Sequence, residues 1–224
     1  MTPPRVLNRH RDTIPPEAVY VGRGTAFGNP YTHRRGSHSA PYLVATRDAA
    51  IQAFATALFA QPTLLLHVRE ALRGRDLVCS CTPAPCHADI LLRVANGFAV
   101  AIVGSREFPH LDWVEHGVSD MAPGTLMVSG NARGVDRTAE KAARRRGDLL
   151  VVSLPADWNG PHGKLAGFAR NADIVRFADR VVAYWDGKSR GTKHTIDIAT
   201  QQGKPVLVVQ PDGSEHLLNC GGFV

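Results

Sequence analysis

The sequence has few cysteines, few aromatic residues and no long apolar run. Four of its 224 residues are cysteine and 7% are aromatic. No apolar stretch reaches the roughly 18 residues that cross a bilayer, which argues against a membrane protein. Three of the cysteines are crowded together, and this spacing suits a reducing compartment and a local site better than a disulfide framework. We therefore expect a cytoplasmic protein without a membrane partner, and 44% hydrophobic residues are enough for a buried core.

Lysine is absent from residues 1–97, which hold eleven arginines against six acidic residues. Residues 98–224 are closer to neutral, with ten arginines and five lysines against fourteen acidic residues. Arginine suits planar recognition of phosphate or carboxylate, although a GC-rich coding sequence gives the same bias. The first part of the chain carries most of the positive charge, and its meaning stays open between anion recognition and simple solvation.

Short, continuous apolar runs recur through the second part of the chain. Helix-length stretches separate them, and the runs lie at 99–103, 125–129, 149–153, 181–185 and 205–209. Continuous rather than alternating runs indicate strands that are covered on both faces. The stretches 133–146 and 192–202 each end at a glycine, as helices often do. Residues 98–224 are therefore predicted to form an α/β domain, a Rossmann-like doubly wound parallel sheet.

Glycines, hydroxyls and arginines follow three of these runs. The carboxyl ends of parallel strands meet at one edge of a sheet, where loops and helix N-termini bind anions. We therefore expect the three loops to converge on the phosphate of a small molecule. The predicted ligand-binding residues are Gly104, Ser105, Arg106, Ser129, Gly130, Arg133, Gly134, Gly187, Lys188, Ser189, Arg190, Gly191 and Thr192.

Four motifs occur in a characteristic order. They are "VGSREF", "SGNARGVDRTAE", "LPADWNGPHGKLAGFARNADIV" and "AYWDGKSRGTKHTI". Together they resemble the SLOG superfamily of Rossmann-like nucleotide-binding proteins, in the branch of YspA-type proteins. That superfamily also includes the cytokinin-activating phosphoribohydrolases and the DNA-processing protein A fold. The resemblance covers about residues 98–210. It implies that the chain binds a nucleotide, with Asn171 as a further ligand-binding residue, and that the preceding Arg170 matches the catalytic arginine of the phosphoribohydrolases.

The resemblance breaks at one residue of the hydrolase motif. The glutamate of the phosphoribohydrolases falls on Thr195, which cannot act as a carboxylate. Cleavage of an N-glycosidic bond needs a charge for the oxocarbenium-like centre and a base that orients water. Asp136, Asp186 or Asp173 could supply them. We predict a nucleotide N-glycosidase that uses Arg170 with Asp136 or Asp186, and the alternative is a non-catalytic sensor of a nucleotide or ADP-ribose-type ligand.

Residues 1–97 are predicted to form a smaller α/β domain. Strands are expected at 17–22 and 76–81. Three helices are expected: one at 47–59, a second that ends at Gly74, and a third at 86–96. The run "VGRGTAFGNPY" is not a dinucleotide fingerprint, because Asn-Pro stands where a helix should begin. It forms a glycine-rich loop that offers Arg23 as a further ligand-binding residue. With "LVCSCTPAPCHADIL" it resembles a small domain of unknown function from bacteria and phages, which implies no activity.

Cys79, Cys81, Cys86 and His87 leave three interpretations open. They suit a zinc site, although the single residue between Cys79 and Cys81 is shorter than the spacer of structural zinc knuckles. They also suit a reactive thiolate at a helix N-terminus, or small buried thiols that fill a core. We assign no metal and no cofactor on this pattern, and we expect Cys220 to be incidental.

The predicted partner is a small-molecule nucleotide or nucleotide derivative. Nucleic acid ranks below it, because the aromatic residues of the basic part show no regular stacking pattern. The sequence does not predict the base. The oligomeric state also stays open, with a homo-oligomer among the alternatives.

Overall fold

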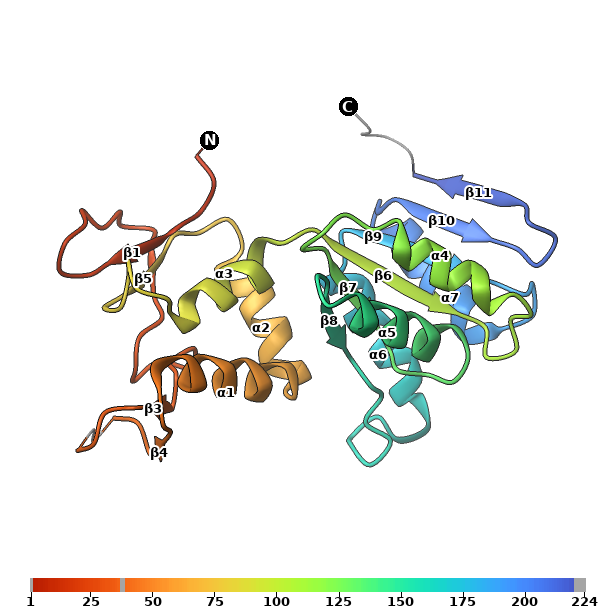
Figure 1. Cartoon of the computed structure of the whole chain (residues 1–224). Helices are drawn as coiled ribbons and strands as arrows, with labels where there is room; N and C mark the ends of the chain where they lie inside the picture. Colours follow the sequence, from red (N-terminus) through yellow and green to blue (C-terminus); the bar gives the residue numbers. More distant parts are fainter. Residues whose placement is uncertain (1, 37–38, 220–224) are drawn as a thin grey trace. The chain divides into compact units, whose positions relative to one another are not determined.

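The computed structural model describes residues 2–36 and 39–219, so Cys220 lies outside the described residues. The chain divides into two compact units, Met1–Gly97 and Phe98–Val224, each with its own buried core (Figure 1). No single helix of the described part is long and apolar enough to cross a membrane. One helix pair, Arg47–Phe59 with Pro62–Leu72, meets the requirement of length and composition, but the two helices are bent by 101°.

The unit Met1–Gly97 contains a three-stranded parallel sheet in the order β1-β5-β2. Its strands are β1 (Val6–Asn8), β2 (Val19–Tyr20) and β5 (Leu77–Cys79). A separate parallel pair joins β3 (Tyr31–Thr32) to β4 (Tyr42–Leu43). The helices are α1 (Arg47–Phe59), α2 (Pro62–Leu72) and α3 (His87–Asn96). The core between them is apolar and includes the fully buried Leu58, Leu65 and Leu77.

The predicted helices of this unit are confirmed within a residue or two, but the strands are shorter than expected. The chain turns after β2, where the Thr25 N–H donates to the Gly22 carbonyl over 3.3 Å. It turns again after β5, where the Ala84 N–H donates to the Cys81 carbonyl over 3.1 Å. These turns limit the two strands at their ends, and the Ala18 N–H, which donates to the Pro15 carbonyl over 3.1 Å, delays the start of β2. The predicted 17–22 and 76–81 therefore shrink to β2 and β5.

The unit Phe98–Val224 is built on a six-stranded sheet in the order β11-β10-β9-β6-β7-β8 (Figure 1). The parallel strands are β6 (Ala99–Gly104), β7 (Leu126–Ser129), β8 (Leu150–Ser153), β9 (Arg180–Tyr184) and β10 (Val206–Val209). They coincide with the five apolar runs, which confirms the Rossmann-like doubly wound fold. The antiparallel edge strand β11 (Glu215–Leu218) was not predicted, because it is largely exposed and has no continuous apolar run.

Helices cover both faces of this sheet. α4 (Leu111–Ser119) packs against α5 (Val135–Arg146), and α6 (Ala166–Phe177), preceded by the short turn η1 (Gly163–Leu165), packs against α7 (Arg190–Gln201). Along the sheet the direction of the chain's crossovers reverses between β6 and β9. Gly104 and Tyr184 are paired in the register of these two strands, so both strands end at the same level. Open α/β sheets bind their ligands at such a reversal.

Candidate functional site

A cavity of about 160 Å³ lies where β6 and β9 end. Loops and helices from separate parts of the sequence form its walls. Eight predicted site residues line it: Gly104, Arg106, Asp136, Arg170, Asn171, Ser189, Gly191 and Thr192. Other predicted site residues of this unit are not among its described lining: Ser105, Ser129, Gly130, Arg133, Gly134, Asp186, Gly187, Lys188 and Arg190. The structure therefore brings about half of the predicted set to one place.

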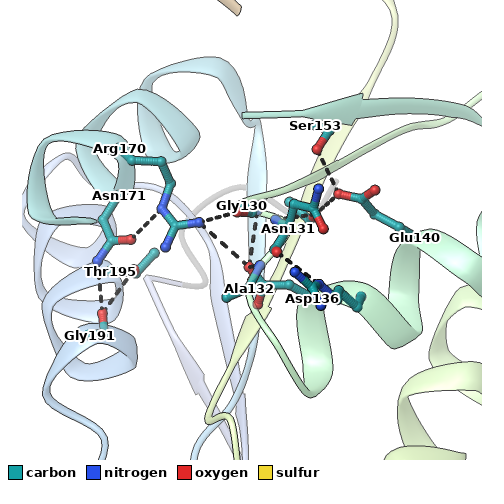
Figure 2. A network of polar contacts seen from close by, with 12 residues as sticks. Gly130, Asn131, Ala132, Asp136, Glu140, Ser153, Arg170, Asn171, Gly191 and Thr195 are labelled. Carbon is teal, nitrogen blue, oxygen red and sulfur yellow. Dashed lines mark hydrogen bonds and ion pairs between the residues drawn. The ribbon is translucent and has the colours of Figure 1, made fainter. Parts of the chain in front are cut away.

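Arg170 connects α6 to the loop between β7 and α5 (Figure 2). Its Nη1 donates to the Gly130 carbonyl over 2.5 Å and lies 3.8 Å from Asp136 Oδ2. Its Nε donates to Asn171 Oδ1 over 3.1 Å. A Cβ on Gly130 would stand 1.4 Å from Nη1, so any other residue here would displace the Arg170 guanidinium from this position. The guanidinium is thus held in one position at the cavity wall.

Asp136 is the buried partner of Arg170, with a side chain that is 5% exposed. Its Oδ2 accepts the N–H groups of Gly130 and Ala132 over 3.1 and 3.4 Å. Burial raises the pKa of Asp136 to about 6, although Arg170 and the backbone donors act in the opposite direction. Burial also lowers the pKa of Arg170. Each charge therefore depends on the other for its stability.

The free energy of unfolding should fall as the pH rises from about 4 to about 6. The pKa of Asp136 is about 6 in the folded chain against an ordinary value of 3.8, so the folded state holds this proton more tightly. The tighter binding of this proton stabilises the folded state fully below the ordinary pKa of 3.8. This stabilisation is lost as the pH rises past about 6, the pKa of Asp136 in the folded chain. A difference of two units corresponds to about 3 kcal/mol.

Urea unfolding of the wild type and of Asp136→Asn from pH 4 to pH 7 checks this prediction. The asparagine does not titrate, so the difference in stability between the two proteins should change by about 3 kcal/mol over the range. A difference that stays constant with pH would show that the Asp136 carboxyl has an ordinary pKa.

The loop before α7 is stabilised by its own side chains. Asp186 Oδ1 accepts the N–H groups of Lys188 and Ser189 over 2.9 and 2.8 Å. Although burial acts in the other direction, these two bonds lower the pKa of Asp186. Ser189 caps the helix, and its Oγ accepts the Thr192 N–H over 3.4 Å. The N–H groups of Lys188 and Ser189, which we expected to bind phosphate, are therefore occupied.

Gly191 is the part of this loop that remains open to a ligand. It is exposed, it lies on the cavity wall, and a Cβ built on it would meet nothing within 4 Å. As a first-turn residue of α7, it presents an N–H group without an intrahelical acceptor. Its carbonyl accepts the Asn171 Nδ2 amide over 3.0 Å, which fixes the helix end against α6. The positive end of the α7 dipole thus faces the cavity.

The two arginines that follow β6 and β7 have different surroundings. Arg106 lines the cavity. Arg133 forms an ion pair with Glu107 on the surface, and both side chains are about 70% exposed. Gly134 has a φ of 83°, and a Cβ there would stand 2.4 Å from the Arg106 carbonyl. This glycine therefore allows the two loops to pack together rather than approaching a ligand.

Ser129 and Ser105, two serines of the predicted set, stabilise the loops through contacts within the protein. Ser129 Oγ donates to Glu140 Oε1 over 2.6 Å. Ser153 Oγ donates to the same oxygen over 2.9 Å (Figure 2). Ser105 is fully buried, and its Oγ accepts the Asp186 N–H over 3.2 Å. These hydroxyls hold the carboxyl ends of the strands in place, and Ser129 and Ser153 use their protons on Glu140 rather than on a ligand.

Several lining residues were not predicted from the sequence, among them Trp158, Lys164 and Phe168. Trp158 and Phe168 are 57% and 41% exposed, and Lys164 lies between them in the chain. Trp158 and Lys164 belong to the polar segment between β8 and α6, which has no apolar run and no glycine-hydroxyl loop after a strand, and Phe168 lies in the first turn of α6. A tryptophan in this segment and a phenylalanine just after it were the available signal. Thr195 also lines the cavity, where the hydrolase motif has glutamate, and its Oγ1 donates to the Gly191 carbonyl over 3.2 Å.

Comparisons with known proteins assign the chain to a family. Residues 6–97 match a family model described as "Domain of unknown function (DUF4326)". The gene 61 protein of Mycobacterium phage D29 is 38% identical over 117 residues, which covers 48% of this chain and 93% of the phage protein. The chain belongs to the family of that phage protein. A 12.4 kDa protein from the nrdA-td intergenic region of Enterobacteria phage T4 is 32% identical over 92 residues, covering 41% of this chain and 77% of the phage protein.

Two structures of DNA processing protein A are similar to half of the chain. The Streptococcus pneumoniae protein has a TM-score of 0.45 at 22% identity, and the match covers 50% of each chain. The Helicobacter pylori protein has a TM-score of 0.37 at 22% identity, and the match covers 50% of this chain and 65% of that chain. The resemblance to the SLOG superfamily, and to its YspA-type proteins and phosphoribohydrolases, stays a prediction.

Arg23 lies in the DUF4326 domain and lines a different cavity, of about 310 Å³. Its Nε donates to the Asn29 carbonyl over 3.4 Å, and its Nη2 donates to the Tyr31 carbonyl over 3.3 Å. The sequence motif around Arg23 therefore lies at a second cavity, which Cys79, Cys81 and Cys86 also line.

Proposed function

We propose that the unit Phe98–Val224 binds a nucleotide in the cavity at the ends of β6 and β9. One observation carries the proposal. The same cavity is lined by the first turn of α7, by Arg106 and Arg170, and by the exposed aromatic residues Trp158 and Phe168. A nucleotide has a matching anionic part and a matching flat aromatic part.

The phosphate position in this proposal is the open end of α7. The Gly191 N–H and the helix dipole favour an anion there. Arg106 and Lys164 line the same cavity and add positive charge. The two carboxylates in the neighbourhood do not compete for this position, because Asp136 faces Arg170 and Asp186 binds its own loop.

The base position in this proposal is the rim of the cavity. A volume of about 160 Å³ is smaller than the roughly 300 Å³ of the smallest typical ligand sites, so it suits a phosphate and ribose rather than a whole nucleotide. Trp158 and Phe168 are exposed enough to stack on a base outside it. Stacking tolerates every base, so the proposal does not depend on a particular one.

Calorimetric titration with the four ribonucleoside monophosphates tests the proposal. Arg106→Ala should weaken binding by about 1.5–3 kcal/mol, the range for a hydrogen bond to a charged group. Arg133→Ala is the matched control and should leave the affinity unchanged, because Arg133 is exposed and pairs with Glu107. Equal effects of the two substitutions would contradict the site. A short single-stranded oligonucleotide in the same titration distinguishes a nucleotide within a nucleic acid from a free one.

Hydrolysis of the N-glycosidic bond is a second candidate function, favoured by Asp136. This carboxyl lines the cavity beside Arg170, and its pKa of about 6 suits a general base at neutral pH. Incubation with nucleoside monophosphates, NAD and ADP-ribose should then release free base, as measured by chromatography, and Asp136→Asn should abolish the release. If no base appears while the nucleotides still bind, the unit is a sensor or carrier without turnover.

A further inference from the structure

Three cysteines of the DUF4326 domain bring their sulfur atoms together. The Sγ atoms of Cys79, Cys81 and Cys86 all lie within 4.8 Å of one another, and those of Cys79 and Cys86 are 3.3 Å apart. Sulfur ligands of tetrahedral zinc, at about 2.3 Å from the ion, are about 3.8 Å from each other. The three thiols are therefore already near the separation that a zinc ion requires.

The backbone of the domain creates this arrangement. β5 ends at Cys79, and the turn closed by the Ala84 N–H and the Cys81 carbonyl reverses the chain. The buried Asn8 donates from Nδ2 to the Thr82 carbonyl and holds the turn against β1. The Cys86 N–H then donates to Asp89 Oδ2 over 2.8 Å at the start of α3. This compact turn explains how a single residue between Cys79 and Cys81 suffices to bring both beside Cys86.

His87 places a ring nitrogen beside one of the three thiols, that of Cys86, but outside the set of atoms that all lie within 4.8 Å of one another. Its Nε2 lies 2.8 Å from the Val21 carbonyl, which can only accept, so Nε2 carries the proton. Nδ1 then carries the lone pair, and it lies 3.4 Å from Cys86 Sγ. Nitrogen and sulfur ligands of one tetrahedral zinc are about 3.6 Å apart. A backbone carbonyl on the far ring nitrogen is the usual partner of a metal-binding histidine.

We propose that Cys79, Cys81, Cys86 and the Nδ1 of His87 bind one Zn²⁺ ion. Binding releases the three thiol protons to solvent and leaves a site with one net negative charge. Arg47, whose Nη1 donates to the Pro85 carbonyl over 3.5 Å, lines the cavity next to the cysteines and balances that charge. A core-filling role does not account for Cys81, which is exposed and still lies with the other two thiols.

Metal analysis of the full chain tests the site. The protein is reduced, supplied with Zn²⁺, freed of unbound metal and analysed by inductively coupled plasma mass spectrometry. We expect one zinc per chain. Cys81→Ser is the decisive variant, because the side chain is exposed and its loss leaves the core unchanged. It should lower the zinc affinity at least 10-fold, and His87→Ala should do the same. Cys220→Ser leaves all four proposed ligands in the chain and is the control that should retain the metal.

Substitution with Co²⁺ gives an independent readout. Thiolate-to-cobalt charge-transfer absorption should appear in the wild type and in Cys220→Ser, and should weaken in Cys81→Ser. A reduced wild type that retains no metal would overturn the proposal, and so would equal losses in Cys81→Ser and Cys220→Ser. An unchanged affinity in His87→Ala would overturn the four-ligand set. Nucleotide titrations do not enter these outcomes, so this test and that of the nucleotide site fail independently.

Discussion

Replacing Gly191 by aspartate should abolish nucleotide binding without destabilising the protein. The substituted carboxylate would occupy the open end of α7, where the phosphate is proposed to bind. Like charges placed together cost several kcal/mol, so the affinity for a nucleoside monophosphate should fall at least about 100-fold. The fold should tolerate the change, because a Cβ at this position meets nothing within 4 Å and the backbone conformation is an ordinary helical one.

The stability of Gly191→Asp distinguishes a loss of nucleotide binding from a loss of the fold. Aspartate near a helix N-terminus interacts favourably with the dipole, and removing a helical glycine gains up to about 1 kcal/mol. Urea unfolding should therefore show an equal or higher stability in Gly191→Asp. Gly191→Ala is the control, since it gains the same backbone stability without the charge and should keep most of the binding. Loss of affinity by similar amounts in both variants would point to a steric effect and contradict the anion position.

Replacing Arg170 by methionine should remove binding and also destabilise the protein. Methionine keeps the bulk of the side chain but leaves the Asp136 carboxylate buried without its partner. Removal of one member of a buried ion pair costs about 3–5 kcal/mol. Arg176→Met is the matched control on the same helix. Its ion pair with Asp173 is half exposed, so the loss there should stay below about 1 kcal/mol.

A double variant separates the two roles of Arg170. Adding Asp136→Asn to Arg170→Met removes the unpaired charge, so urea unfolding should recover at least about 2 kcal/mol of the lost stability. Nucleotide binding should not return, because the guanidinium is still absent from the cavity. Recovery of binding in the double variant would show that Arg170 acts only by neutralising Asp136.

The fold of residues 98–224 was predictable because its strands are buried on both faces. Such strands appear in the sequence as continuous apolar runs, and all five coincide with parallel strands. β11 was not predicted because an exposed edge strand has no continuous apolar run. In the smaller domain, the helices were predictable from their spacing, whereas the strand ends were set by turns at Gly22 and Cys81 that local sequence does not reveal.

The site was predictable in position but only partly in composition. The carboxyl ends of the strands indicate where the site lies. A glycine there can either face a ligand or make room for another part of the protein, and the sequence does not distinguish the two. Gly191 faces the cavity, whereas Gly130 and Gly134 make room for Arg170 and for the Arg106 backbone. The hydroxyl of Ser129 likewise serves a buried carboxylate rather than a ligand. Only the packing of the loops distinguishes these cases.

A crystal structure of the chain with the tightest-binding nucleoside monophosphate is the most direct test of the nucleotide site. We expect the phosphate within hydrogen-bond distance, about 3 Å, of the Gly191 N–H and the Arg106 guanidinium. We also expect the base to be stacked on Trp158 or Phe168. A nucleotide bound at saturating concentration anywhere else, with the end of α7 free of phosphate, would contradict it.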